Sequence, residues 1–209
     1  MARDLLPLFP LNAVLFPRTP MPLHIFEERY KLMIGEAIRD GSEFGIVLAT
    51  DRGMVNVGCS AMVSKTMKQY DDGRMDILTM GRRRFEIYLL NEERDYLQGA
   101  VEFFDDDEAA APAEKSHLEQ AIRGYYACRN LDDAPGLPEP DLNDPQISFQ
   151  LAQLAPDLEL RQSLLAMRSE AARLKLLAQF FPHLLSKEKQ RAHVRKIVPR
   201  NGHGKLNVT

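Results

Sequence analysis

Residues 9–30 read FPLNAVLFPRTPMPLHIFEERY, an apolar segment that prolines interrupt repeatedly. These prolines are Pro10, Pro17, Pro20 and Pro22. Proline fixes the backbone angle φ and has no N–H to donate, so the run is incompatible with a helix or an ordinary central strand. We therefore expect short extended pieces joined by bends, with the prolines at strand ends and turns.

A helix is expected directly after this segment. Its apolar residues fall at positions i, i+3, i+4, i+7 and i+8, which form one stripe along a helix. The stripe consists of Tyr30, Met33, Ile34, Ala37 and Ile38. Gly41 follows Asp40 and is typical of a helix C-terminus, because glycine takes positive φ without strain.

Strand signals dominate the rest of the first half. Short segments with strand character are separated by turn residues. They are residues 44–50, 57–70, 74–80, 84–90 and 96–104. Asp71, Asp72 and Gly73 form one such turn, with Gly73 free to take positive φ. The pattern predicts an α+β protein whose residues 1–106 form a curled sheet or small β-barrel with one packed helix.

The second half is expected to be helical. An acidic run followed by small residues and proline indicates a linker at 107–114, after which the strand signals vanish. Apolar stripes then predict a bundle of about four helices over residues 115–198, interrupted by a proline-rich loop at 132–145. Pro182 lies inside the last stripe and is expected to kink or break that helix.

Charge and cysteine content narrow the class of protein. The net charge is −3, which gives no overall attraction to nucleic acid or membrane. Basic residues are concentrated near the C-terminus, from Lys187 through the last predicted helix and in the predicted tail at 199–209. Cys59 and Cys128 are far apart, which argues against a zinc module or a disulfide framework and favours a reducing compartment. No apolar run approaches membrane-spanning length and the first residues lack a signal-peptide core, so we expect a cytoplasmic protein.

Catalytic signatures are absent from the sequence. It has no GxxxxGK[ST], GxGxxG, GxSxG or HExxH motif, so we expect no catalytic residue, metal or cofactor. His24 is expected to be a hydrogen-bonded structural histidine rather than a catalytic one. The acidic run 105–108 is interpreted as a solvated linker rather than a metal site. Among Arg82, Arg83 and Arg84 we expect two exposed side chains and one inward partner of a carboxylate, with phosphate contact as the alternative.

Several motifs together resemble the N-terminal domain of Lon proteases. The run LPLFPLNAVLFPRTPMPLHIFEERYKLMI contains that family's LPLFPL, VLFP and PLHIFExRY elements. The motifs FGIV (44–47), VG (57–58), DDGR (71–74) and GRRRF (81–85) follow in the order and spacing of the family. The helical segments SFQLAQLAP and RQSLLAMRSEAARLKLLAQFF resemble its second half. The similarity spans about residues 5 to 185.

The resemblance implies a PUA-like β domain followed by a helical subdomain. It implies that the opening segment is apolar because it belongs to the core, and proline-rich because it turns corners. It also implies a role in recognising polypeptide substrates or protein partners, connected with protein turnover. The chain lacks the ATPase module and the Ser–Lys peptidase domain of full-length Lon, so we expect no enzyme activity. Arg18 stands where the family commonly has glycine.

We expect binding to take place in an apolar groove where the β domain meets the helical bundle. The residues predicted to contact an unfolded polypeptide are Pro17, Arg18, Pro20 and Met21. A rigid proline bend presents side chains at little entropic cost. We also expect Glu27 to be structural and to pair with Arg84 or Arg82, or failing that with Arg29, since its charge opens the first helix beside an apolar residue.

Two other functions remain alternatives. Nucleic acid, RNA in particular, is one, because PUA-like folds often serve RNA and the arginine triplet and basic tail offer phosphate contacts. The acidic body argues against it. An unrecognised hydrolase is the other, supported only by His24 and scattered carboxylates. The sequence predicts neither the identity of a ligand nor an oligomeric state.

Overall fold

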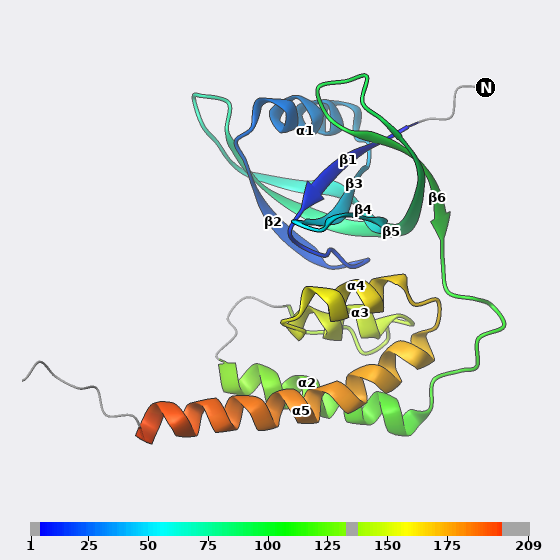
Figure 1. Cartoon of the computed structure of the whole chain (residues 1–209), viewed down its shortest axis with the longest axis vertical. Coiled ribbons are helices and arrows are strands. Elements are labelled where there is room, and N and C mark those ends of the chain that lie inside the picture. Colours follow the sequence, from blue (N-terminus) through cyan, green and yellow to red (C-terminus); the bar gives the residue numbers. More distant parts are fainter. Residues whose placement is uncertain (1–4, 133–137, 198–209) are drawn as a thin grey trace, which may run out of the picture.

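The computed structural model describes residues 5–132 and 138–197, which form a β-rich half and a helical half stacked along the long axis (Figure 1). The strands are β1 (Leu6–Leu11), β2 (Pro20–Ile25), β3 (Phe44–Thr50), β4 (Gly53–Gln69), β5 (Met75–Asn91) and β6 (Gln98–Phe104). The helices are α1 (Glu28–Asp40), α2 (Lys115–Asp132), α3 (Ile147–Leu151), a 3-10 turn (Ala152–Leu154), α4 (Leu158–Ala166) and α5 (Glu170–Ile197). The tail predicted at 199–209 lies outside the described residues.

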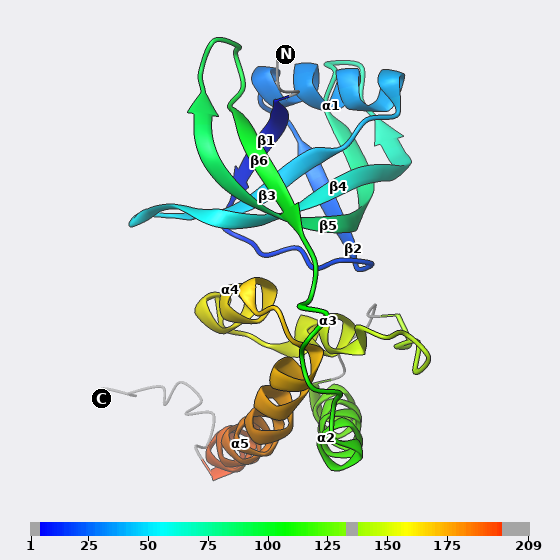
Figure 2. The ribbon, with the colours of Figure 1, turned by 90° about the vertical axis from the view of Figure 1, so that its right-hand side faces the viewer.

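The sheet curls into a barrel, in agreement with the sequence (Figure 2). Its strand order is β2-β5-β4-β3-β1-β6, and β6 also pairs with β5, so five strands close a ring and β2 extends it along β5. β1 and β3 are parallel, whereas the other pairs are antiparallel. No described helix is long and apolar enough to cross a membrane.

Phe85 fills the barrel interior together with Leu8 and Val47. These residues come from β5, β1 and β3, and β5 is not hydrogen-bonded to the other two strands, so their contact lies across the ring. Gly45 and Gly58 make room for the ring of Phe85, because a Cβ on either glycine would lie 2.6 Å from its Cζ. A side chain at either position would therefore displace the central aromatic residue.

The opening segment forms β1, a tight turn and β2, and then leads into α1. Phe16 is fully buried in the turn, and its carbonyl accepts a hydrogen bond from Thr19 Oγ1 at 2.8 Å. The Arg18 N–H donates to the Gly81 carbonyl at 2.8 Å, with Arg18 at φ 57°. The run is thus apolar because it packs in the core and proline-rich because it bends, and Arg18 holds a backbone angle that favours glycine.

Local signals for α1 and for the β4–β5 turn are confirmed. α1 ends at Gly41, which has φ 61°, and its N–H donates to the carbonyl of Ala37. Gly73 has φ 82° in the turn before β5. The predicted stripe is buried except for Ile38, which is exposed. α5 continues through Pro182 without a break.

The main hydrophobic core runs through both halves of the molecule. The rings of Phe16 and Phe149 stack 5.8 Å apart, which joins the opening turn to α3. α2 and α5 pack so closely that a Cβ on Gly124 would lie 2.5 Å from Cβ of Phe181. Because one cluster crosses the junction, the division at 106, 114 and 198 stays a prediction.

Candidate functional site

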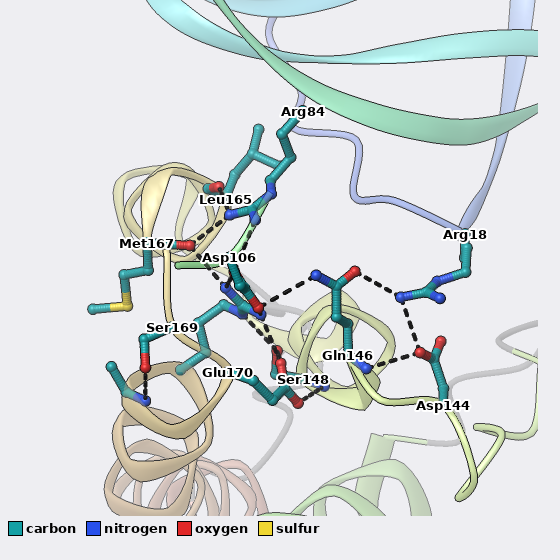
Figure 3. Close-up of polar contacts among 12 residues, drawn as sticks. Arg18, Arg84, Asp106, Asp144, Gln146, Ser148, Leu165, Met167, Ser169 and Glu170 are labelled. Carbon is teal, nitrogen blue, oxygen red and sulfur yellow. Dashed lines mark hydrogen bonds and ion pairs between the residues drawn. The ribbon is translucent and has the colours of Figure 1, made fainter. Parts of the chain in front are cut away.

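A buried ionic cluster lies where the two halves meet (Figure 3). Arg84 of β5 and Arg173 of α5 are only 2% and 0% exposed, although both carry a charge. The Asp106 carboxylate lies between them, with Arg84 Nη2 at 2.8 Å from Oδ1, and Arg173 Nη1 and Nη2 at 2.6 and 2.5 Å from Oδ1 and Oδ2. This bidentate geometry is the strong form of an arginine–carboxylate pair.

Further groups complete what we call the interdomain cluster, defined as Arg84, Asp106, Ser148, Glu170 and Arg173. Arg173 Nε donates to Ser148 Oγ at 2.8 Å, and that hydroxyl donates to Glu170 Oε2 at 2.6 Å. Glu170 also accepts from Arg173 Nη2 at 2.7 Å. Both arginines donate in addition to the backbone carbonyl of Met167. The cluster thereby ties β5, the segment after β6, α3 and α5 together.

Burial and charge act in opposite directions on Asp106. Burial alone would raise its pKa, but the hydrogen bonds and charges of Arg173 and Arg84 outweigh it and hold the pKa below the usual range. Burial lowers the pKa of Arg84, and Asp106 opposes that shift. The carboxylate and both guanidinium groups are mutually satisfied. We therefore interpret the cluster as structural, holding the two halves of the molecule together.

The opening turn reaches the same junction. Arg18 Nη2 lies 2.9 Å from Asp144 Oδ1 and donates to Gln146 Oε1 at 2.7 Å, while Gln146 Nε2 donates to Asp106 Oδ2 at 3.3 Å. Pro17 is buried, and Pro20 and Met21 are half-buried. Of the four residues predicted to bind a polypeptide, Arg18 contacts the helical half, and the role of all four in binding stays a prediction.

The predicted pair of Glu27 with Arg84 is wrong. Glu27 Oε2 lies 2.8 Å from Nη2 of Arg29, the third partner considered, and both side chains are well exposed. Arg84 instead points to Asp106. The acidic run looked like a solvated linker, and that interpretation fails at Asp106, the one member that long-range folding brings against two buried arginines.

Both cysteines are buried, and His24 pairs with a carboxylate at the surface. Burial raises the pKa of the Cys59 thiol to about 12, which disfavours the reactive thiolate. Cys128 is buried as well. His24 Nδ1 lies 2.6 Å from Asp76 Oδ1 on the surface, and the Tyr70 hydroxyl donates to Asp76 Oδ2 at 2.8 Å. Within residues 5–132 and 138–197, there is no cluster of three or more aspartate, glutamate, histidine or cysteine residues that could hold a metal ion.

An exposed apolar surface lies at the start of β4 and the end of β5. It lines a hollow of about 250 Å³ in which Asn56 is the only amide and no residue is charged. We call it the apolar strip, defined as Met54, Val55, Ile87, Tyr88, Leu89 and Leu90. Leu89 is 61% exposed and Tyr88 52%, although Met54 and Ile87 below them pack on the barrel interior. Contiguous exposed apolar side chains mark interaction sites.

Comparison with known proteins identifies the family. The family model for the ATP-dependent protease La (LON) substrate-binding domain matches residues 5–181. A Lon N-terminal domain protein from Xanthomonas campestris has a similar structure, with a TM-score of 0.65, 25% identity, and coverage of 85% of this chain and 98% of that one. The N-terminal domain of Lon protease from the Mycobacterium avium complex shares the fold, with a TM-score of 0.61, 14% identity, and coverage of 86% and 98%.

Full-length relatives are much longer than this chain. Lon protease of Parabacteroides distasonis is 29% identical over 112 residues, which cover 49% of this chain and 14% of the relative. Lon protease 2 of Syntrophobacter fumaroxidans is 25% identical over 189 residues, which cover 84% of this chain and 24% of the relative. The family match over residues 5–181 shows that this chain belongs to the Lon substrate-binding domain family.

Proposed function

We propose that this chain is a non-catalytic module that binds unfolded polypeptides or protein partners in connection with protein turnover. The family's substrate-binding domain and the Lon protease relatives support a role in binding protein substrates. The observation that carries the proposal is the apolar strip, because it offers an uncharged, solvent-exposed surface to a chain that exposes its own apolar residues. A reducing, cytoplasmic location belongs to the same proposal.

The chemistry of the strip suits partners of varied sequence. Leu89, Leu90 and Tyr88 lie side by side at the end of β5, and Met54 adds a flexible thioether beside them. Apolar contact is non-directional, and methionine adapts its shape to different partners. A few residues supply most of the binding energy at an interface, and tyrosine is one of the enriched types, so Tyr88 is the strongest candidate anchor of the strip. The strip therefore fits recognition of unfolded segments better than recognition of one small ligand.

The positions of the three arginines argue against nucleic-acid binding, the alternative function. Arg84 is buried in the interdomain cluster, and Arg83 lies 3.3 Å from Glu43. Only Arg82 of the three is exposed with no ion pair shown among the described residues. Phosphate binding needs several unengaged cations, so the triplet offers little for it.

The test compares two exposed leucines on opposite halves. Leu89→Asp places a charge in the apolar strip, whereas Leu142→Asp alters a leucine of similar exposure, 57% against 61%, in the helical half. Binding of a fluorescein-labelled, reduced and alkylated protein, which stays unfolded, is followed by anisotropy. Losing burial of one leucine removes about 1.5–3 kcal/mol, so Leu89→Asp should weaken binding at least about tenfold. Equal affinities in both variants would rule out the strip.

A further inference from the structure

The β-barrel is closed along only part of β6. β6 pairs with β5 from Gln98 to Phe104, but with β1 only through Leu6 with Gly99 and Pro7 with Gln98. In the described part of the chain, residues 100–104 therefore have a strand neighbour on one side only. Figure 1 shows β6 continuing past β1 toward the helical half. Such an edge carries backbone N–H and C=O groups without a ladder partner.

A hollow of about 610 Å³ lies along this edge. β6 contributes the side chains of Val101 and Phe103, which are two positions apart and so lie on one face of the strand. The opposite walls are formed by the start of β1, with Leu6, and by α1, with Met33 and Ala37. The hollow thus combines an open strand edge with apolar walls that alternate side chains can enter.

Ion pairs line the rim of the hollow at two places. Arg83 reaches Glu43 and lies 3.7 Å over the ring centre of Phe103. Elsewhere on the rim, Glu36 Oε2 accepts hydrogen bonds from Arg94 at 2.9 Å and from the Tyr96 hydroxyl at 2.5 Å. Asp40 also lines the hollow and is paired with Arg39 beside it. Each lining charge thus has a partner, which favours no strongly acidic or basic occupant and leaves the backbone edge as the main recognition element.

We infer that the hollow takes one extended segment of a polypeptide client, which adds to β6 as an antiparallel strand. The segment lies on the same side of β6 as β1 does. β1 pairs there with Gln98 and Gly99, and the segment pairs with the residues that follow, with its C-terminal end toward Leu5. Backbone hydrogen bonds supply affinity independent of sequence, and the apolar walls take alternate side chains. The inference rests on the proposed function and adds the mode of binding to it.

The first test separates backbone from side-chain recognition. The probe is a fluorescein-labelled peptide of about ten residues, alternating valine and threonine with terminal lysines, in its parent form and with N-methyl groups on either alternate set of residues. An antiparallel strand directs alternate N–H groups to one neighbour. One N-methylated set should therefore bind at least about tenfold more weakly than the parent peptide while the other set binds nearly as well. Equal binding of both sets to the full chain would overturn strand addition.

A second test locates the strand. Phe103→Ser removes an aromatic wall of the hollow, and Phe26→Ser removes an exposed phenylalanine outside the walls of the hollow. We expect a tenfold loss of parent-peptide affinity for Phe103→Ser alone, with melting temperatures within a few degrees of the parent protein for both. Unchanged affinity in a folded Phe103→Ser variant would overturn the site.

The outcomes keep the inference and the proposed function apart. If neither the peptide nor the unfolded protein binds, the proposed function fails and the inference fails with it. If the unfolded protein binds and responds to Leu89→Asp, but the peptide shows no N-methyl effect, only strand addition is overturned. Deletion of residues 1–4 should leave peptide affinity unchanged. A tenfold gain in affinity together with a lower melting temperature would mean that the chain's own first residues occupy the position beside residues 100–104, and would overturn the inference.

Discussion

The interdomain cluster and the apolar strip invert the usual distribution of side chains. Arg84 and Arg173 are buried at the junction of the two halves, whereas Leu89 and Tyr88 are more than half exposed on the barrel. Arginine is rarely fully buried unless it is paired, and exposed apolar side chains are informative only when they are contiguous. The two regions therefore differ in purpose: one fixes the geometry of the molecule and the other is available to a partner.

The contacts of each region explain why the arginines can be buried and the apolar side chains exposed. A buried charge is strongly unfavourable without a partner, and a guanidinium group between carboxylate oxygens and backbone carbonyls meets that requirement. Asp106 connects segments that are far apart in the chain, since Arg173 follows it by 67 positions. The exposed side chains of the apolar strip are apolar apart from the Tyr88 hydroxyl, which donates to the Val101 carbonyl at 3.4 Å, so changing Leu89 should alter binding far more than stability.

The largest effect is expected from Asp106→Ala. The substitution leaves the charges of Arg84 and Arg173 buried with their shared carboxylate removed, and breaking a buried pair from one side costs about 3–5 kcal/mol. Urea unfolding followed by circular dichroism measures the loss. Asp107→Ala is the matched control, since its side chain is exposed and the backbone makes its hydrogen bonds, from its N–H to the carbonyl of Arg168 and from the Ala110 N–H to its carbonyl. Equal stability of both variants would contradict the structural role of the interdomain cluster.

Acid should weaken the same cluster. The folded pKa of Asp106 lies below its unfolded value, which is about 3.9. Its contribution is therefore present above pH 4 and is lost as the pH falls through the folded pKa. The free energy of unfolding, measured by urea titration from pH 6 to pH 2, should fall less steeply in Asp106→Asn than in the parent chain. Parallel curves would mean that another carboxylate is responsible.

A smaller effect is expected at Arg18. Arg18→Ala removes the contacts to Asp144 and Gln146 and should cost about 1–2 kcal/mol, because Asp144 is left nearly buried. Arg18→Gly loses the same contacts but relieves the left-handed backbone at φ 57°, which is worth about 1 kcal/mol. The glycine variant should therefore be the more stable of the two in urea. The reverse order would show that the backbone there carries no strain.

The smallest effect is expected at Glu27. Its partner Arg29 is about half exposed, and exposed ion pairs contribute under about 1 kcal/mol. Glu27→Gln should shift the melting temperature by no more than a few degrees in calorimetry. A loss as large as that of Asp106→Ala would restore Glu27 as a buried structural charge.

Local features of the fold could be read from the sequence because their causes are local. Gly41 and Gly73 take positive φ where a helix and a hairpin end, and the prolines bend the opening segment without reference to distant residues. The acidic run gave no local sign that Asp106 is buried, since its partners lie in β5 and α5. One available signal was Arg173, which falls on the buried stripe of α5 with Leu177 and Phe181.

The apolar strip also left a sign in the sequence. Ile87, Tyr88, Leu89 and Leu90 are consecutive, and side chains on a strand alternate between faces, so they could not all point into the barrel. The sequence also predicts binding at the proline bend, because a rigid bend presents side chains at little entropic cost. Burial could not be predicted there, since Pro17 is buried while the neighbouring Arg18 is exposed and reaches Asp144 and Gln146 of the helical half.

Measuring stability and client affinity together in Leu89→Asp and Asp106→Asn tests the central claim most directly. Unfolding in urea and anisotropy with the unfolded, labelled protein are recorded on the same samples, at a temperature where both variants are folded. We predict that Leu89→Asp loses affinity at least about tenfold while its stability changes by under about 1 kcal/mol. We predict the opposite for Asp106→Asn, with a loss of stability and an unchanged affinity. If both variants lose affinity and stability in parallel, the division between a structural cluster and a binding strip is contradicted.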